Sequence, residues 1–456
     1  MGRAIAAAAL TVLAGSIAAR ATTVPAAYSR LSNGVTLIVS EQHTLPIVAV
    51  QVMIDAGARL DPPRKAGVAA LTADLLNEGT AKRSATEISD AIDFIGGALE
   101  TAADTDSASI ALSVLSKDLD TGIDLLSDIL MRPAFREEEV ARRREAALGS
   151  IREAEDQPGT VASKAFQETL FGNGPYGHPA EGTRESVAKL TRADVVDFYH
   201  RYYRPGRTIV TVVGDVTAGA IAAQLEKALA TWTGGAGEPF QYPAEPPPAK
   251  KLVTIDKPLT QANIILGHRG IARDNPDYYA VTVMNYVLGA GGFSSRLLDN
   301  IRTQGGLAYS VASVFSVNKS PGSFQVVMQT KNPSAADAIA RARAEINRIR
   351  REPITDDELS EAKRYLTGSF PLKLDSTRKI AGFLAQVEFY GLGRDYADSY
   401  AQRINAITKD DVLRVAQQYL KPEDLILVVV GKLSETPLSN VTPATGTEVG
   451  GDSVAK

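Results

Sequence analysis

The histidines of this chain, which could bind a metal ion or move a proton, are few and far apart in sequence. Imidazole groups can do both, but no two histidines are three or four residues apart, the spacing that places two ligands on one helix face. The chain has no cysteine, which excludes thiolate ligands, a thiol nucleophile and disulfides. A metal site would therefore need ligands from distant segments, with Asp74 as a further oxygen ligand. The histidines are His43, His178, His200 and His268.

Three other functional classes gain no support from the sequence. There is no Gly-x-Ser-x-Gly pattern, which presents the nucleophile of many serine hydrolases. The glycines at 289–292 lack the spacing and the lysine of a phosphate-binding loop. The formal net charge is −4, so the chain has no basic excess that would attract nucleic acid.

Residues 67–80 carry a helical pattern in which the chemically active positions are replaced. The segment Gly-Val-Ala-Ala-Leu-Thr-Ala-Asp-Leu-Leu-Asn-Glu-Gly-Thr resembles the active helix of the pitrilysin/insulinase-like zinc metallopeptidases, the inverzincins. In that family two histidines one helical turn apart hold zinc, and a glutamate between them takes a proton from the metal-bound water. The resemblance places Ala70 and Asp74 at the histidine positions and Ala73 at the glutamate position. An alanine side chain can neither bind zinc nor accept a proton.

The position of the third zinc ligand is also replaced. The family supplies this ligand as a glutamate on a later helix, shortly before an Asp-x-Pro sequence. Residues 147–151 and the Asp-Gln-Pro at 156–158 resemble that region, and Ser150 stands where the glutamate would be. Four coordinated losses in a preserved frame imply a peptidase fold that is not a peptidase by itself, with no metal in this chain.

A second family signature is intact. Residues 291–297 and 301–311 resemble the family pattern Ser-Ser-Arg-Leu followed by Arg and Gly-Leu-Ala-Tyr-Ser-Val. In the family an arginine and a tyrosine seven positions apart hold the scissile region of the substrate and stabilise the tetrahedral intermediate. The resemblance assigns these roles to Arg302 and Tyr309. A guanidinium and a phenol are donors that can be aimed at a developing oxyanion. We expect Arg296 to have a structural role instead.

The chain repeats itself. Residues 191–214 return as residues 408–431, in register, 217 positions later. Each copy reads as a threonine-capped helix, a proline stop and a buried strand that ends at glycine. The Gly- and Pro-rich residues 237–250 between the copies are typical of a linker. We therefore predict homologous domains at 25–236 and 251–435, followed by a disordered tail at 436–456 that is rich in Thr, Gly, Ser and Pro.

The order of the expected elements favours an α+β fold. Strand-like runs and helical patterns do not alternate strictly, which favours a mixed, largely antiparallel sheet packed with helices in each domain. The family resemblance implies the same, with the two domains facing each other as a clam-shell. Strands are expected at 34–39, 47–53, 252–255 and 262–266, and helices at 119–131, 137–154, 191–203 and 335–351, the last with Ser334 as its N-cap.

The first residues indicate export. Residues 1–21 combine Arg3, an Ala-rich apolar run and an Ala-Arg-Ala cleavage sequence, the pattern of a secretory signal peptide. We expect a periplasmic protein with no membrane attachment after cleavage. Retention of the segment as an N-terminal anchor is the alternative.

These observations lead to one main hypothesis and two alternatives. The main hypothesis is a non-zinc-binding subunit of a heterodimeric peptidase, in which a paralogous partner supplies zinc and this chain supplies Arg302 and Tyr309 to a composite site that hydrolyses peptides. The first alternative is an inert scaffold or peptide-binding subunit, like the core proteins of respiratory complex III. The second is an independent peptidase with a relocated metal.

Overall fold

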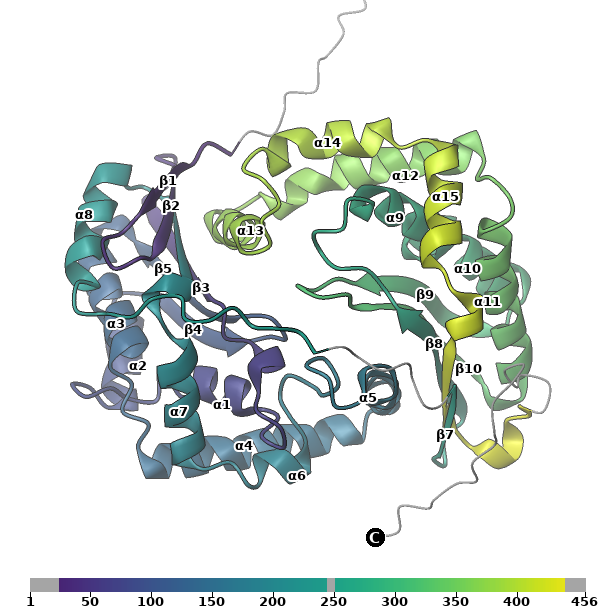
Figure 1. The fold of residues 1–456 in the computed structure, drawn as a ribbon, viewed down its shortest axis with the longest axis horizontal. Coiled ribbons are helices and arrows are strands. Elements are labelled where there is room, and N and C mark those ends of the chain that lie inside the picture. Colours follow the sequence, from purple (N-terminus) through teal and green to yellow (C-terminus); the bar gives the residue numbers. More distant parts are fainter. Residues whose placement is uncertain (1–23, 244–250, 439–456) are drawn as a thin grey trace, which may run out of the picture.

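The structure is a computed structural model that describes residues 24–243 and 251–438. It contains two halves that face each other, each with one sheet packed with helices (Figure 1). The first sheet has the strand order β1-β2-β6-β3-β5-β4, and the second has the order β7-β11-β8-β10-β9. Most neighbouring strands are antiparallel, and the exceptions are the pairs β2–β6 and β7–β11. The predicted α+β clam-shell is confirmed.

The first half contains six of these strands and eight α-helices within its described residues. Its strands are β1 (Ala27–Arg30), β2 (Thr36–Glu41), β3 (Ile47–Ile54), β4 (Ala98–Ala103), β5 (Ala108–Leu115) and β6 (Thr208–Gly214). Its helices are α1 (Val68–Asp74), α2 (Ala85–Phe94), α3 (Leu119–Met131), α4 (Glu137–Glu155), α5 (Pro158–Phe171), α6 (Arg184–Val187), α7 (Arg192–Tyr202) and α8 (Ala218–Ala228).

The second half follows the same plan. Its strands are β7 (Leu252–Asp256), β8 (Gln261–Arg269), β9 (Ala308–Ser316), β10 (Ser323–Lys331) and β11 (Ile426–Gly431). Its helices are α9 (Tyr278–Asn285), α10 (Arg296–Leu298), α11 (Ala335–Ile349), α12 (Asp356–Ser369), α13 (Thr377–Phe389), α14 (Tyr396–Ala406) and α15 (Lys409–Tyr419). A π-helical segment, η6 (Asp299–Gln304), joins α10 to the loop before β9.

The sequence repeat corresponds to a helix and a central strand in each half. Thr191 and Thr408 begin α7 and α15 with capping boxes, in which each hydroxyl accepts a hydrogen bond from the backbone N–H of the aspartate three residues later. The strands that follow, β6 and β11, lie inside their sheets and are rich in buried β-branched residues. The repeat therefore corresponds to an inner strand of each sheet and to the helix that precedes that strand.

Each half packs one of its helices against the sheet of the other half. Helix α5 of the first half packs Phe166 and Leu170 against Ile265 and Val428 of the second sheet. Helix α13 of the second half packs in the equivalent way against the first sheet, and both helices lie between the two sheets (Figure 1). The packing at α5 is close, because a Cβ atom added at Gly267 would stand 2.6 Å from the Phe166 ring. Burial of these apolar faces holds the halves together.

A buried carboxylate also joins the halves. Asp106, in the turn between β4 and β5, is 2% exposed. Within the first half it pairs with Arg59 at 3.1 Å and accepts a hydrogen bond from the Tyr176 hydroxyl at 2.9 Å. From the second half it accepts the backbone N–H of Lys319 at 2.8 Å and the Tyr390 hydroxyl at 3.2 Å. Such a buried charge is stable only because it is paired and hydrogen-bonded on all sides.

We expect Asp106→Asn to destabilise the protein by about 2 kcal/mol, because hydrogen bonds to a charged group are lost and the new amide donors face existing donors. Thermal unfolding followed by calorimetry would measure the change. The matched control is Asp93→Asn, an exposed aspartate of α2, which should change the melting temperature little. A variant at Asp106 as stable as the control would contradict this role.

Other sequence predictions have mixed outcomes. The helices expected at 119–131, 137–154 and 191–203 are α3, α4 and α7, and the helix expected from residue 335 is α11. The capping role of Ser334 was wrong: a 3-10 turn (Asn332–Ser334) precedes α11, Ser334 is already helical, and its side chain makes no capping hydrogen bond. The predicted signal peptide lies outside the described residues, as do 244–250 of the linker and 439–456 of the tail.

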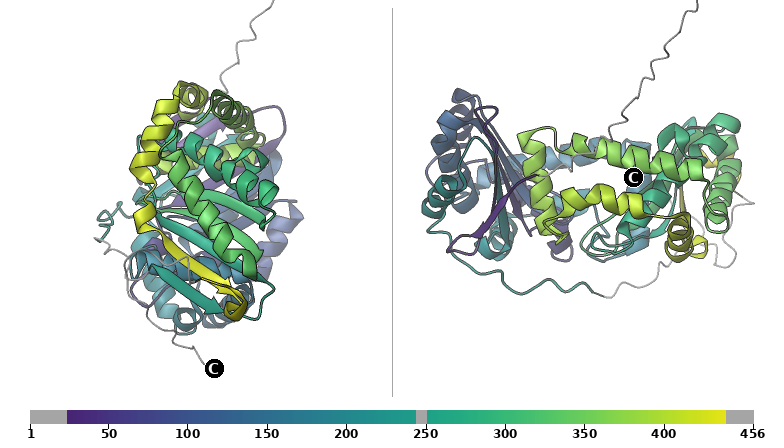
Figure 2. Two further views of the ribbon diagram at one scale, coloured as in Figure 1. Left: turned by 90° about the vertical axis from the view of Figure 1, so that its right-hand side faces the viewer. Right: turned by 90° about the horizontal axis from the view of Figure 1, so that it is seen from above.

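The domain limits stay predictions. Residues 233–243, before the gap in the described chain, run along one side of the molecule (Figure 2). No helix within residues 24–243 and 251–438 is long and apolar enough to cross a membrane.

Candidate functional site

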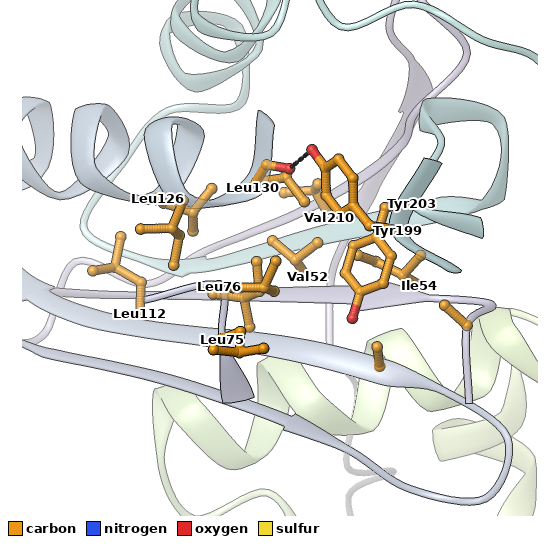
Figure 3. Packing of buried hydrophobic residues seen from close by; sticks show 14 of the residues in the cluster. Val52, Ile54, Leu75, Leu76, Leu112, Leu126, Leu130, Tyr199, Tyr203 and Val210 are labelled. Atoms are coloured by element: carbon orange, nitrogen blue, oxygen red, sulfur yellow. Dashed lines mark hydrogen bonds between the residues drawn. The ribbon is translucent and has the colours of Figure 1, made fainter. Parts of the chain in front are cut away.

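Helix α1 is held firmly although its metal-binding side chains are absent. Leu71 and the two leucines that follow the helix, Leu75 and Leu76, belong to the buried core of the first half, and Figure 3 shows the latter two among side chains of the sheet and of α3. At the other end, Asp61 accepts hydrogen bonds from the backbone N–H groups of Gly67 at 2.6 Å and Ala69 at 2.9 Å. Burial raises the pKa of Asp61 to about 8, against the lowering effect of these two donors.

The structure brings three of the four replaced positions together. Ala70 and Asp74 of α1 and Ser150 of α4 line one cavity of about 380 Å³. Arg143 and Glu181 also line this cavity, which we call the α1–α4 pocket. The fourth position, Ala73, is fully buried and does not line it. Three positions that the resemblance assigns to zinc ligands therefore converge in this fold, and their side chains supply one carboxylate and no imidazole.

The residues of the α1–α4 pocket do not fit a zinc ion. Zinc needs at least three nitrogen, oxygen or sulfur ligands from the protein, and Asp74 is the only ionisable group at the replaced positions. Its carboxylate makes no hydrogen bond or ion pair with any described residue, and burial raises its pKa although Arg143 lowers it. The described part of the chain contains no group of three His, Cys, Asp or Glu residues arranged to hold a metal. We therefore assign no metal chemistry to this pocket.

The four histidines lie in separate places, and three of them have a side-chain polar contact with a described residue. His43 is exposed and lies 2.8 Å from an oxygen of Asp215. His178 places its Nδ1 atom 3.0 Å from the carbonyl oxygen of Pro179, and His268 is buried and accepts the backbone N–H of Lys421 at 3.0 Å. His200 is exposed on α7. The relocated-metal alternative thus finds no ligand set among the described residues.

Arg302 and Tyr309 lie side by side in the second half. Arg302 belongs to η6, and Tyr309 is the second residue of β9, the last strand of its sheet. The Cζ atom of Arg302 lies 5.5 Å from the centre of the Tyr309 ring and 5.0 Å from the centre of the Phe293 ring. Neither the guanidinium nor the Tyr309 hydroxyl has a hydrogen-bond or ion-pair partner among the described residues, and Tyr309 is 74% exposed. Their donors are free to bind a ligand.

The segment that carries Arg302 is anchored on its other side. Leu297 and Ile301 are fully buried in the core of the second half. Arg296 donates two hydrogen bonds to Glu358, at 2.6 and 2.7 Å, and only 8% of its side chain is exposed. Arg296 therefore fixes this segment to helix α12, in agreement with the structural role expected from the sequence. Arg302, six residues later, is left without such a partner.

Sequence reasoning missed three residues that shape these sites. Asp61 lies six residues before Gly67, the N-cap residue of α1, and nothing local announces it. Asp106 contacts the second half through partners 213 and 284 positions away. Phe293 lies within the quoted segment 291–297, and a large aromatic residue in a glycine- and serine-rich loop was the available signal.

Comparisons with known proteins agree with the fold. Residues 37–184 match the family described as "Insulinase (Peptidase family M16)", and residues 189–366 match "Peptidase M16 inactive domain". A relative in Streptomyces coelicolor, named an uncharacterized zinc protease, is 32% identical over 414 residues, 88% of this chain and 89% of that protein.

Two solved structures resemble the chain closely. The first is described as a peptidase M16 inactive domain from Pseudomonas fluorescens. Its TM-score is 0.84 at 27% identity, and the match covers 89% of this chain and 98% of that one. The second is a chain of complex III from Candida albicans, with a TM-score of 0.76 at 19% identity over 90% of this chain and 96% of that one. The second likeness shows the fold alone.

Proposed function

The chain belongs to the insulinase-like peptidase family, and we propose that it is the non-zinc-binding subunit of a heterodimeric metallopeptidase that hydrolyses peptides. In this proposal a zinc-bearing paralogue provides the metal and the general base. This chain contributes Arg302 and Tyr309 to a composite site. The proposal includes export to the periplasm, which rests on residues 1–21.

One observation carries the proposal: the zinc-binding part of the family site is replaced in this chain, whereas its Arg/Tyr part is present. Ala70, Asp74 and Ser150 still converge on one pocket but cannot bind zinc. Arg302, which is half-buried, and the exposed Tyr309 keep donors that have no hydrogen-bond or ion-pair partner among the described residues. Donors without such a partner add no hydrogen bond to the fold, so their presence supports a role toward a substrate.

The chemistry of the pair follows from its groups. The guanidinium of Arg302 presents several N–H donors in one plane, and the Tyr309 hydroxyl presents one more. Donors fixed beside a peptide carbonyl stabilise the negative charge that develops on its oxygen when a nucleophile attacks. An extended peptide could reach this place along β9, whose outer edge pairs with no described strand.

A scaffold or peptide-binding subunit is the second candidate. It is supported by the likeness of the fold to a chain of complex III. A scaffold needs the interlocked halves and the buried core, but it has no use for the free donors of Arg302 and Tyr309. Their substitution therefore separates the two candidates.

The proposal is tested by measuring zinc content and peptidase activity of the purified chain, alone and mixed with a zinc-bearing paralogue from the same genome. We expect no bound zinc and no activity for the chain alone, and activity well above that of the paralogue alone in the mixture. Zinc and activity in the isolated chain would overturn the proposal. A mixture that forms a complex but is no more active than the paralogue would favour the scaffold.

A further inference from the structure

An exposed phenylalanine lies against the guanidinium group of Arg302. Phe293 is 74% exposed, yet its ring centre lies 5.0 Å from the Cζ atom of Arg302, within the range of a cation–π contact. The Tyr309 ring lies 5.5 Å from the same atom. Arg302 therefore has two aromatic contacts, one from the loop before α10 and one from β9.

These rings are the contacts that hold the guanidinium in place. The Arg302 side chain makes no ion pair or hydrogen bond within the described ranges 24–243 and 251–438. Arg296, by contrast, is fixed by two hydrogen bonds to Glu358. An arginine on a flexible stem samples many rotamers unless something restricts it. Aromatic rings restrict it through the faces of the guanidinium and leave the N–H donors at its edges free.

The loop is built so that Phe293 can occupy this place. Gly292 has a φ of +58°, in the left-handed region that favours glycine. A Cβ atom at Gly291 would stand 2.8 Å from the carbonyl oxygen of Tyr286, so this position also requires glycine. The turn is closed by hydrogen bonds from the backbone N–H and the hydroxyl of Ser295 to the carbonyl oxygen of Gly292, at 3.0 and 2.7 Å. The backbone on both sides of Phe293 is thus defined.

We propose that Phe293 is a positioning residue, which orients the Arg302 guanidinium so that its edge donors meet the substrate. The inference rests on the proposed function, because it concerns the composite site. Phe293 itself makes no contact with the reacting atoms. It limits the rotamers of Arg302, so less conformational freedom is lost when the transition state is bound.

The test compares Phe293→Leu, Phe293→Tyr and the control Phe94→Leu in the complex with the zinc-bearing paralogue. Phe94, at the end of α2, is 91% exposed and has no described contact with a cation, so it matches Phe293 in type and exposure. We expect Phe293→Leu to lower kcat about tenfold, in line with loss of one cation–π contact, and to leave KM and complex formation unchanged. Phe293→Tyr keeps an aromatic ring and should keep the native kcat, and Phe94→Leu should leave kcat unchanged.

A double-mutant cycle shows whether Phe293 acts through Arg302. In an Arg302→Met background, Phe293→Leu should cause no further loss. An equal further loss, an unchanged kcat of Phe293→Leu alone, or a failure of that variant to assemble would each overturn the inference. If Arg302→Met lowers activity but Phe293→Leu does not, the positioning role fails and the composite site stands. If Arg302→Met and Tyr309→Phe both keep full activity, the proposed function itself fails.

Discussion

Replacing Tyr309 by phenylalanine is expected to lower the turnover of the assembled complex by about two orders of magnitude. That loss is typical for removal of one donor that stabilises an oxyanion. The substitution removes only the hydroxyl, which has no partner among the described residues. The ring that faces Arg302 remains. The effect should therefore appear in kcat, with the stability of the chain and its binding to the paralogue unchanged. Steady-state kinetics and size-exclusion chromatography would measure both.

A second exposed tyrosine provides the control for this experiment. Tyr365 of α12 is 57% exposed, and its ring packs on Tyr286, far in sequence from the Arg302 segment. Tyr365→Phe removes a hydroxyl of the same kind, so its turnover should stay within about twofold of the native complex. Equal activity of Tyr309→Phe and Tyr365→Phe would remove Tyr309 from the composite site.

Restoring three ligands should restore metal binding. Because Ala70, Asp74 and Ser150 line one pocket, Ala70→His, Asp74→His and Ser150→Glu together would present two imidazoles and one carboxylate to the same space. We expect the triple variant to bind about one zinc ion per chain, at least a thousandfold more tightly than the native chain, equivalent to about 4 kcal/mol. Calorimetric titration with zinc would measure this. At a zinc concentration one hundred times Kd, binding adds about 2.7 kcal/mol to the stability.

The matched control moves the carboxylate by one residue. Gly149 precedes Ser150 on α4, does not line the α1–α4 pocket, and has open space around an added Cβ atom. The variant with Ala70→His, Asp74→His and Gly149→Glu has the same composition of new ligands, but neighbouring residues on a helix point about 100° apart. It should bind zinc much more weakly. Equal affinity of the two variants would mean that the three positions do not converge as the structure shows.

Much of the architecture could be predicted from the sequence because its signals are local. The copies at 191–214 and 408–431 announce two related halves through a capping threonine, a proline and a β-branched strand. The replacements at positions 70, 73 and 74 are equally local, since the chemistry of a motif depends on residue types one helical turn apart. The Arg302–Tyr309 pair could be recognised in the same way, because both residues lie in one short segment, and its catalytic role stays a prediction. The error at Ser334 was also local: propensity indicated a cap, and an additional helical turn took its place.

The tertiary structure alone decided how the halves are joined and how Arg302 is held. The exchange of α5 and α13 depends on which apolar faces meet, and every amphipathic helix offers such a face. Asp106 gains its two partners in the second half only after segments more than two hundred positions away are brought together. The sequence contains Phe293 but does not show its contact with Arg302, because a cation–π contact depends on the geometry of a folded loop. The sequence thus determined which chemical groups the chain retains and which it lacks. Their environment required long-range contacts, because burial and pairing are properties of the packed molecule and not of any local pattern.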